Sequence, residues 1–422
     1  MRFVGFVFLL FFYLYVPEII FMPVSLRLIF GALGLMLYFV RLINKYKNVS
    51  DDVSLNKDLL LFWSGTLSFL LLATFVVFIN ESGDAKVISE IVVRFCMLFG
   101  GAYFLTWYIK QFYRELDYQV ILKAYVTVLA LQCIIGVLTF TNPVIKDLFE
   151  SIQKPNEANI RNKVGVMRMS GFGLTFFGAG LDCGIALMVI AHLVRQNAYK
   201  SMQLTYWAFL FLFIMSVGTF MARTTLIGGL LAFGYLMLPA SNSGKNFKFA
   251  SITLVTIILI ASYTIPIMLN SEKYGMVIRF AFEAFFNYTE YGSLETESSN
   301  DLQTMYRFPE EFKTYLIGDG WLNHPEIEGY YYMQTDVGYL RLIYFGGIGY
   351  CLLWFIFHYL MLNRIAANLN VKEVKWFVLT LFAFLVIVNV KGLADFFPLI
   401  FLLLIFSSEF KALQTDKLNE TN

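Results

Sequence analysis

Charged side chains are scarce in this sequence. Only 15% of the 422 residues are Asp, Glu, Lys or Arg, while 58% are hydrophobic and the mean hydropathy is +0.65. A surface that faces water cannot be built from so little charge, which excludes a soluble chain. The net charge of +2 is small, and the cations are spread over short loops. The sequence therefore offers no basic patch for binding nucleic acid.

Cysteine is also scarce, and its placement excludes a disulfide framework. The four cysteines lie in apolar segments without a CxxC pair, so we interpret them as packing residues. At the N-terminus, the apolar run that follows Arg2 shows no small-residue cleavage site before Pro17. We therefore expect this run to be a retained first helix.

Long apolar runs are abundant, and they predict an all-α, polytopic membrane bundle. A span needs about 20 apolar residues, and the runs predict about twelve transmembrane helices. Two long runs are divided at Arg223 and Lys391, because a cation in mid-bilayer is costly. The predicted spans are 3–15, 24–42, 59–79, 87–109, 120–140, 171–194, 203–220, 224–238, 249–269, 336–362, 376–390 and 393–406.

The distribution of Lys and Arg over the short loops predicts the orientation of the bundle. Cations gather in one alternating set of loops, which identifies that set as cytoplasmic and makes both termini cytoplasmic. These cations are Arg41, Lys45, Lys47, Lys57, Lys110, Arg114, Arg195, Lys200, Lys245, Lys248, Arg364, Lys372 and Lys375.

The same topology divides the chain into regions. Residues 1–269 hold the first nine spans with a short outer loop near 141–170, residues 270–335 form a large extracytoplasmic loop, residues 336–410 hold the last three spans, and 411–422 is a cytoplasmic tail. Within the large loop, the acidic and hydroxyl-rich stretch 287–300 is expected to be the most flexible part.

Two arginines next to apolar runs are candidates for a site. Arg223 needs a partner or a wet cavity, so it either snorkels to the headgroups, pairs with Asp182 on a neighbouring helix, or forms an anion site. Arg341 lies about 1.4 turns inside its span and should pair inward or line a cavity. Asp336, at the outer start of the same span, is either a helix cap or part of the site.

A third arginine, Arg168, precedes the sixth predicted span. Gly171 and Gly173 follow it closely, so backbone N–H groups could approach a bound anion there. The alternative is an arginine that contacts lipid phosphates while the glycines pack helices. The later spacing of Gly178, Gly180 and Gly184 indicates helix packing.

The end of the large loop combines several kinds of chemical group. Arg307, Asp319, Trp321 and His324 bring a cation, a carboxylate, an aromatic face and an imidazole into one stretch, and Gly318 indicates a tight turn. His324 is the one histidine of three on the predicted outer side. It is therefore a candidate base or hydrogen-bond donor, and the alternative is a surface histidine without a role.

These motifs resemble the O-antigen and polysaccharide repeat-unit polymerases of the Wzy type, which are related to O-antigen ligases. The resemblance covers nearly the whole chain by topology and four short patches by motif: "ARTT" at 222–225, "RMSGFG" at 168–173, "GDGW" at 318–321 and "TDVGYLRLIYFGGIG" at 335–349. Such polymerases show an arginine, ten further residues and a glycine in their outer loops. Arg307 and Gly318 fit that spacing, whereas Arg168 reaches Ala179 instead.

The resemblance implies a reaction, a location and partners. It implies a GT-C-like fold and an inverting glycosyl transfer without metal or cofactor, joining undecaprenyl-diphosphate-linked oligosaccharides, donor to acceptor, on the periplasmic face of the bacterial inner membrane. The lipid bilayer, a chain-length regulator and a flippase are the implied partners, and nucleic acid is not among them.

The resemblance also assigns roles to residues. Arginine grips phosphate oxygens bidentately and stays charged beside lipid, which favours Arg168, Arg223 and Arg307 for the diphosphate. Arg341 joins them or holds a carboxylate. His324 is the first choice for activating the acceptor hydroxyl. Asp319 and Asp336 are the next candidates for that role after His324. Trp321 and Tyr330–Tyr332 would stack on sugar rings.

Three other functions compete with the polymerase. A ligase would move finished glycan from the same lipid to lipid A-core, but ligases resemble this chain less at 336–339, where they more often show a histidine and an asparagine. A flippase for lipid-linked oligosaccharides usually has internal repeats and short loops, which this sequence does not show. A purely structural membrane protein would have little reason to keep Arg223 and Arg341 beside lipid.

Overall fold

The fold was obtained as a computed structural model, which describes residues 1–17, 19–47, 56–81, 84–113, 115, 117–153, 169–174, 176–197, 199–239, 243–327 and 329–420. Throughout these ranges the regular structure is helical. The only β-type pairings among these residues are two isolated bridges, Ile19 with Gln153 and Asn323 with Tyr331. The predicted all-α class is therefore confirmed.

Twelve helices correspond to the twelve predicted spans. Their bounds are α1 (Arg2–Leu14), α2 (Leu26–Lys47), α3 (Lys57–Ile79), α4 (Lys86–Phe112), α5 (Tyr118–Thr141), α8 (Phe176–Gln196), α9 (Ser201–Met221), α10 (Thr224–Met237), α11 (Ser243–Leu269), α16 (Gly338–Leu369), α17 (Lys372–Val388) and α18 (Phe397–Glu420). In the described ranges, eight helices are both long and apolar enough to cross a membrane. The chain is thus a polytopic membrane protein.

Some of the twelve helices are short for a bilayer. α1 has 13 residues and α10 has 14, so at 1.5 Å per residue each is about 20 Å long, against about 30 Å of hydrocarbon. The predicted breaks are confirmed: α9 ends at Met221 and α10 begins at Thr224, while α17 ends at Val388 and α18 begins at Phe397. Arg223 and Lys391 therefore lie between helices.

The two long loops contain helices of their own. The first holds α6 (Pro143–Ile152), and the second holds α12 (Glu272–Ala281), α13 (Glu283–Tyr291), α14 (Glu297–Met305), α15 (Phe312–Ile317) and the 3-10 turn η1 (Tyr332–Gln334). The stretch 287–300, whose flexibility stays a prediction, contains the end of α13, the connection 292–296 and the start of α14. Thr296 caps α14 by accepting a hydrogen bond from the Ser299 N–H at 3.0 Å.

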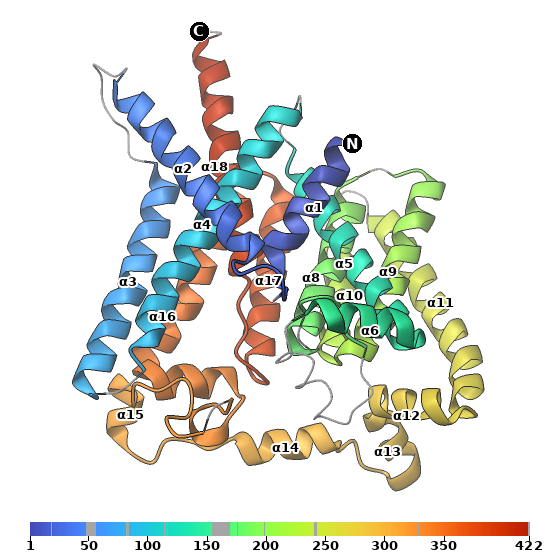
Figure 1. Cartoon of the computed structure of the whole chain (residues 1–422). Coiled ribbons are helices and arrows are strands. Elements are labelled where there is room, and N and C mark those ends of the chain that lie inside the picture. The colour runs from blue at the N-terminus through green and yellow to red at the C-terminus, as the bar shows by residue number, and fades with distance from the viewer. Residues whose placement is uncertain are drawn as a thin grey trace.

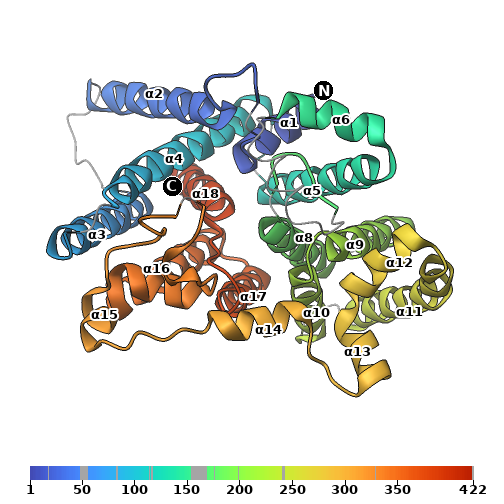
Figure 2. The same ribbon diagram turned by 60° about the horizontal axis from the view of Figure 1, so that its bottom comes forward.

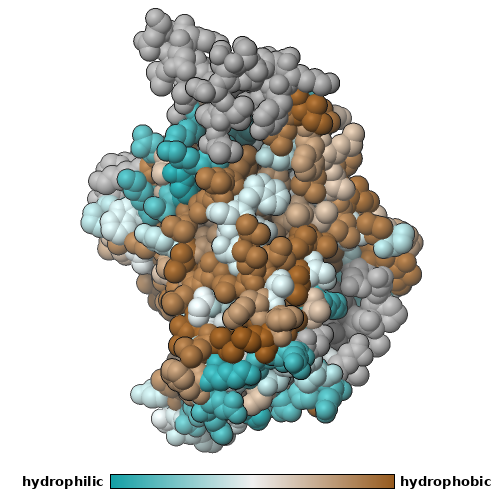
Figure 3. Space-filling model, turned by 90° about the vertical axis from the view of Figure 1, so that its left-hand side faces the viewer, coloured by the Kyte–Doolittle hydropathy of each residue, from teal (hydrophilic) through white to brown (hydrophobic). Residues whose placement is uncertain are grey.

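The helices are arranged as an upright bundle with a cap at one end. Both termini lie at one end, and α12–α15 lie across the opposite end (Figure 1). Seen from that opposite end, α14 crosses the bundle between α10 and α17 (Figure 2). One side of the molecule shows a broad apolar band, with hydrophilic residues gathered below it (Figure 3). This band is what lipid contact requires.

Glycine contacts bring neighbouring helices close together. A Cβ atom on Gly34 of α2 would lie 1.7 Å from the carbonyl oxygen of Gly100 on α4. A Cβ on Gly228 of α10 would lie 2.2 Å from the Cα of Gly184 on α8. Only glycine allows backbones to approach so closely. The packing role predicted for Gly184 is therefore confirmed, and the contact fixes α10, whose start carries Arg223.

A break in α16 attaches the large loop to the bundle. Gly346 and Gly347 depart from helical geometry, with φ of −138° and 72°. The break frees backbone carbonyls of Tyr344 and Phe345, which accept hydrogen bonds from the N–H groups of Asp319 (2.6 Å) and Gly320 (3.1 Å). Docking of the loop thereby supplies hydrogen-bond donors to backbone carbonyls that the break leaves without partners in the helix. It also fixes the first turns of α16, where Arg341 lies.

The glycine contact predicts a difference between two substitutions in the same helix. Gly228→Ala should lower the stability of the protein by about 1–3 kcal/mol, because the new methyl group meets the α8 backbone. Gly234→Ala has nothing within 4 Å and should be neutral or stabilising by up to about 1 kcal/mol, because alanine favours helix. Thermal unfolding of the purified variants in detergent measures both. Equal melting temperatures of the two variants would contradict the close contact between α8 and α10.

Candidate functional site

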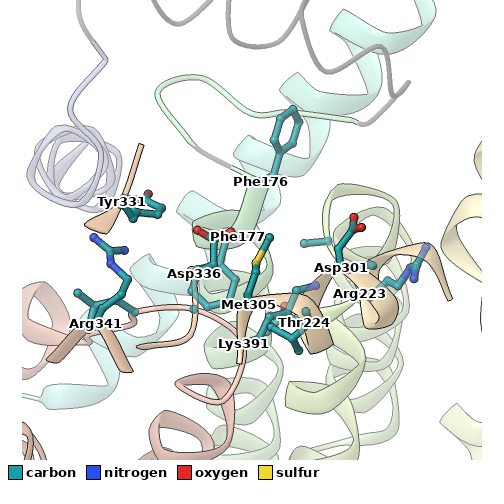
Figure 4. Close-up of a pocket in the computed structure, with 15 residues that line it drawn as sticks. Phe176, Phe177, Arg223, Thr224, Asp301, Met305, Tyr331, Asp336, Arg341 and Lys391 are labelled. Carbon is teal, nitrogen blue, oxygen red and sulfur yellow. The ribbon is translucent and has the colours of Figure 1, made fainter. Parts of the chain in front are cut away.

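The candidate site is a cavity between the bundle and its cap. Its volume is about 330 Å³, and its lining comes from six separate parts of the chain. Figure 4 shows the lining residues, which are Phe176, Phe177, Ala222, Arg223, Thr224, Ser298, Asp301, Leu302, Met305, Tyr331, Asp336, Arg341, Lys391, Gly392 and Leu393. Helix α14 supplies one part of the lining, and the starts of membrane helices, Tyr331 and the loop residues 391–393 supply the rest.

Three helices begin at this cavity. Phe176 is the first residue of α8, Thr224 is the first of α10, and Arg341 is the fourth of α16. The first backbone N–H groups of a helix have no partner within the helix, and the helix dipole places partial positive charge there. The fold therefore favours an anion in this cavity before any side-chain charge is added.

Arg341 holds one end of the cavity. Its guanidinium carbon lies 3.5 Å from the ring centroid of Tyr331, a cation–π contact. Its buried Nε makes no hydrogen bond within the described residues. The expectation that Arg341 lines a cavity is confirmed, and the guanidinium keeps hydrogen-bonding capacity for a ligand.

Arg223 lies at the far end of the cavity from Arg341 (Figure 4). It precedes the first residue of α10, and its guanidinium forms an ion pair with Glu283 at the start of α13. The alternative partner, Asp182, instead accepts a hydrogen bond from the Tyr125 hydroxyl at 3.1 Å. Pairing of Arg223 with Asp182 is therefore wrong, because the cap approaches the break between α9 and α10.

Lys391 and two carboxylates complete the charged lining. Lys391 comes from the loop between α17 and α18, Asp301 from α14, and Asp336 from the segment before α16. Asp336 is not the cap of α16, whose N-cap residue is Val337. Partial burial raises the pKa of the Asp336 carboxyl above its usual value, while Arg341 and Lys391 oppose that rise. Three cations thus face two carboxylates.

Several predicted site residues do not line the cavity. The Asp319 carboxylate accepts a hydrogen bond from the Thr314 hydroxyl at 2.7 Å, and Gly318 has a φ of +69° at the end of α15, so both serve the docking of the loop. Arg307 is exposed, and its Nε contacts its own loop at the Thr304 carbonyl. Trp321 is half-buried away from the cavity.

The predicted base, His324, is also outside the cavity. Its Nδ1 accepts hydrogen bonds from the N–H groups of Glu326 (3.2 Å) and Ile327 (3.1 Å), which closes a turn in the loop. His324 was favoured because it is the one histidine on that side of the chain, but the turn orients its ring within the loop. Arg168 lies outside the described residues, so its predicted role stays a prediction.

Two charged lining residues, Lys391 and Asp301, were missed as site residues by the sequence interpretation. The sequence did indicate Lys391, because this lysine divides the last apolar run and lies in a loop on the same predicted side of the membrane as Arg223. Asp301 had none, since it follows the stretch that was expected to be flexible. Its place depends on α14 crossing the bundle. Within the described ranges, no three His, Cys, Asp or Glu side chains gather in a way that could hold a metal ion.

Comparison with known proteins adds no relative to this geometry. The chain matches no protein-family model, no curated protein sequence and no solved structure.

The raised pKa of Asp336 predicts a pH effect on anion binding. As the pH falls, the Asp336 carboxyl becomes protonated at a higher pH than the carboxyl of an ordinary aspartate would. Loss of this negative charge beside Arg341 should strengthen binding of inorganic diphosphate by about twofold to tenfold. Isothermal titration calorimetry of the wild type and of Asp336→Asn at several pH values measures the effect. Protonation of the diphosphate itself affects both proteins equally, so the difference between their affinities reports on Asp336. Identical pH profiles would contradict this role for Asp336.

Proposed function

We propose that this protein is an inverting glycosyltransferase that polymerises undecaprenyl-diphosphate-linked oligosaccharide repeat units into O-antigen or capsular polysaccharide. One observation carries the proposal: Arg223, Asp336, Arg341 and Lys391, which come from three separate parts of the sequence, line one cavity at the capped end of an apolar bundle. In this proposal the capped end faces the periplasm, and both termini lie in the cytoplasm of a bacterial cell. The loop cations support that orientation.

The charges of the cavity suit a lipid diphosphate. Three cations and three helix starts surround a volume that also contains two carboxylates. A diphosphate placed among them would be neutralised by charge-assisted hydrogen bonds, which are stronger than neutral ones. The position between apolar bundle and polar cap would let the lipid chain stay in the bilayer while the sugars contact the cap. A soluble anion would gain nothing from that position.

The residues also suggest how the transfer proceeds. An acceptor sugar hydroxyl attacks the anomeric carbon of the donor sugar, and the bond from that carbon to the diphosphate oxygen breaks with inversion. Asp336 takes the hydroxyl proton, and its raised pKa makes it a better base than an ordinary aspartate. Arg341, Lys391 and Arg223 stabilise the charge that develops on the leaving diphosphate. Asp336 thus replaces His324 as the preferred base.

Tyr331 and α14 give the cavity its further features. The Tyr331 ring lies against the Arg341 guanidinium, so it limits the rotation of that side chain, and 39% of its surface stays exposed for contact with a sugar. From α14, Leu302 and Met305 supply apolar surface, and Asp301 supplies a carboxylate that would accept hydrogen bonds from sugar hydroxyl groups. Preorganised cations with restricted access to water are what electrostatic catalysis needs.

Loss of Arg223 should abolish chain extension. Arg223→Ala removes a partly buried counter-charge of the diphosphate, and we expect extension to slow by about 10²–10³-fold. Gel analysis of surface glycans from a complemented deletion strain measures it: a lost polymerase leaves single repeat units attached, a lost ligase leaves none, and a lost flippase causes accumulation inside the cell.

Two variants control for a merely structural effect. Glu283→Gln breaks the same ion pair but keeps the cation, and should leave extension intact. Arg279→Ala removes an exposed arginine of the cap that pairs with Glu290 at 3.0 Å, and should also extend normally. Full ladders from correctly inserted Arg223→Ala protein would refute the proposal. Incubation of purified protein with one defined lipid-linked repeat tests the activity directly.

A further inference from the structure

A second polar cavity lies deeper in the bundle. Its volume is about 370 Å³, and its charged lining residues are Arg27, Arg94, Asp182 and Asp395. Arg27 and Arg94 also line a groove between α2 and α4, where they stand beside the apolar residues Leu28, Val93 and Met97. Leu28 and Val93 are exposed on helices of membrane length. The two arginines therefore separate a lipid-facing groove from an interior cavity.

The groove exists because α2 starts part-way along the bundle. Gly31 and Gly34 of α2 pack against Met97 and Gly100 of α4 without room for a side chain. Arg27 lies one turn before this contact, in the first turn of α2. Figure 1 shows the lower ends of α1 and α2 well above those of α3 and α4. The part of α4 nearest the cap is therefore not packed against α2, whereas the remainder of α4 is.

The arginines keep hydrogen-bonding capacity, while the carboxylates around them have partners. Arg27 donates to the carbonyls of Tyr13 (2.8 Å) and Leu14 at the end of α1, and its second Nη group has no hydrogen bond within the described residues. Among the residues that the structure describes, Arg94 donates only through Nη2, to Asp395 at 2.7 Å, and its side chain is 44% exposed.

The two other carboxylates of this region are occupied as well. Glu90, in the groove, pairs with Lys86 at 3.5 Å, and Asp182 accepts from Tyr125. Guanidinium N–H groups beside lipid are costly unless a partner is supplied. A phosphate would supply one, because its oxygens match the planar fork of arginine.

We propose that Arg27 and Arg94 bind the phosphate of a polyprenyl-phosphate lipid whose chain lies in the groove between α2 and α4. The identity of this lipid rests on the proposed function. The cavity behind the arginines shares walls with the candidate site: the segment 391–393 lines the first cavity and 395–399 the second, and α8 contributes 176–177 to the first and 178–185 to the second. A second phosphorylated substrate would thus be held next to the site of transfer.

Native mass spectrometry of the full-length protein with undecaprenyl monophosphate tests this site. The wild type should retain two lipids, one per cavity. Arg94→Gln should retain one, with at least a tenfold loss of affinity at the second site, because a charge-assisted hydrogen bond to phosphate is lost. Arg27→Gln should behave in the same way, and inorganic phosphate at equal concentration should not displace the lipid.

Asp395→Asn is the matched control. It breaks the same ion pair, leaves the Arg94 guanidinium in place and keeps an oxygen for the Phe397 N–H, so it should retain two lipids. Arg41→Gln breaks a comparable pair with Glu409 at the other end of the bundle and should also retain two. If Arg94→Gln retains two lipids, or if Asp395→Asn loses as much as Arg94→Gln, the inference is overturned.

The readout separates this inference from the proposed function. Arg223→Ala should lose the lipid of the first cavity and keep that of the second. If Arg223→Ala protein extends glycan normally while Arg94→Gln loses one lipid, the proposed function fails and the second site stands. If Arg223→Ala stops extension but Arg94→Gln binds as the wild type does, the second site fails and the proposed function stands. Displacement of the lipid by inorganic phosphate would show a site for free phosphate and overturn the lipid assignment.

Discussion

A cationic side chain in a membrane bundle is stable only where a carboxylate, an aromatic ring, water or a ligand surrounds its charge. This constraint governs the arrangement at the capped end of the protein. Arg341 lies against the Tyr331 ring, Arg223 pairs with Glu283, and Arg94 pairs with Asp395. The contacts Arg223–Glu283 and Arg94–Asp395 each join a membrane helix or its end to a segment far away in the sequence. The Arg223–Glu283 pair thereby links the bundle to the cap at a position where charge must be accommodated.

Backbone geometry makes these contacts possible. The break of α16 at Gly346 and Gly347 frees carbonyls that receive the loop at Asp319 and Gly320. The glycine contact between α8 and α10 places the starts of both helices in the lining of the first cavity. Helix starts carry partial positive charge, so packing alone prepares the cavity for an anion. The side-chain cations then add to a field that the backbone already provides.

Neighbouring segments of α8 and of the chain between α17 and α18 line the two cavities, and this arrangement gives the proposed reaction a physical basis. The loop between α17 and α18 contributes Lys391 to one cavity and Asp395 to the other. A glycosyl transfer between two lipid-linked substrates requires both lipids in the bilayer and their sugars in one space. Effective concentration rises steeply when two reactants are held in adjacent sites. The proposed reaction requires little more than this placement, because a diphosphate is already a good leaving group.

Sequence alone determined the helical class, the positions of the apolar segments and the breaks at Arg223 and Lys391. These features follow from hydropathy along a single segment, which is a local property. Tertiary structure decided which charges meet. It brought Asp336 and Arg341 to the same cavity as Lys391, and it paired Arg223 with Glu283 rather than with Asp182. It also oriented the His324 ring toward the backbone of its own loop. No local pattern encodes such contacts, because they depend on where α14 crosses the bundle and on how closely glycines allow helices to approach.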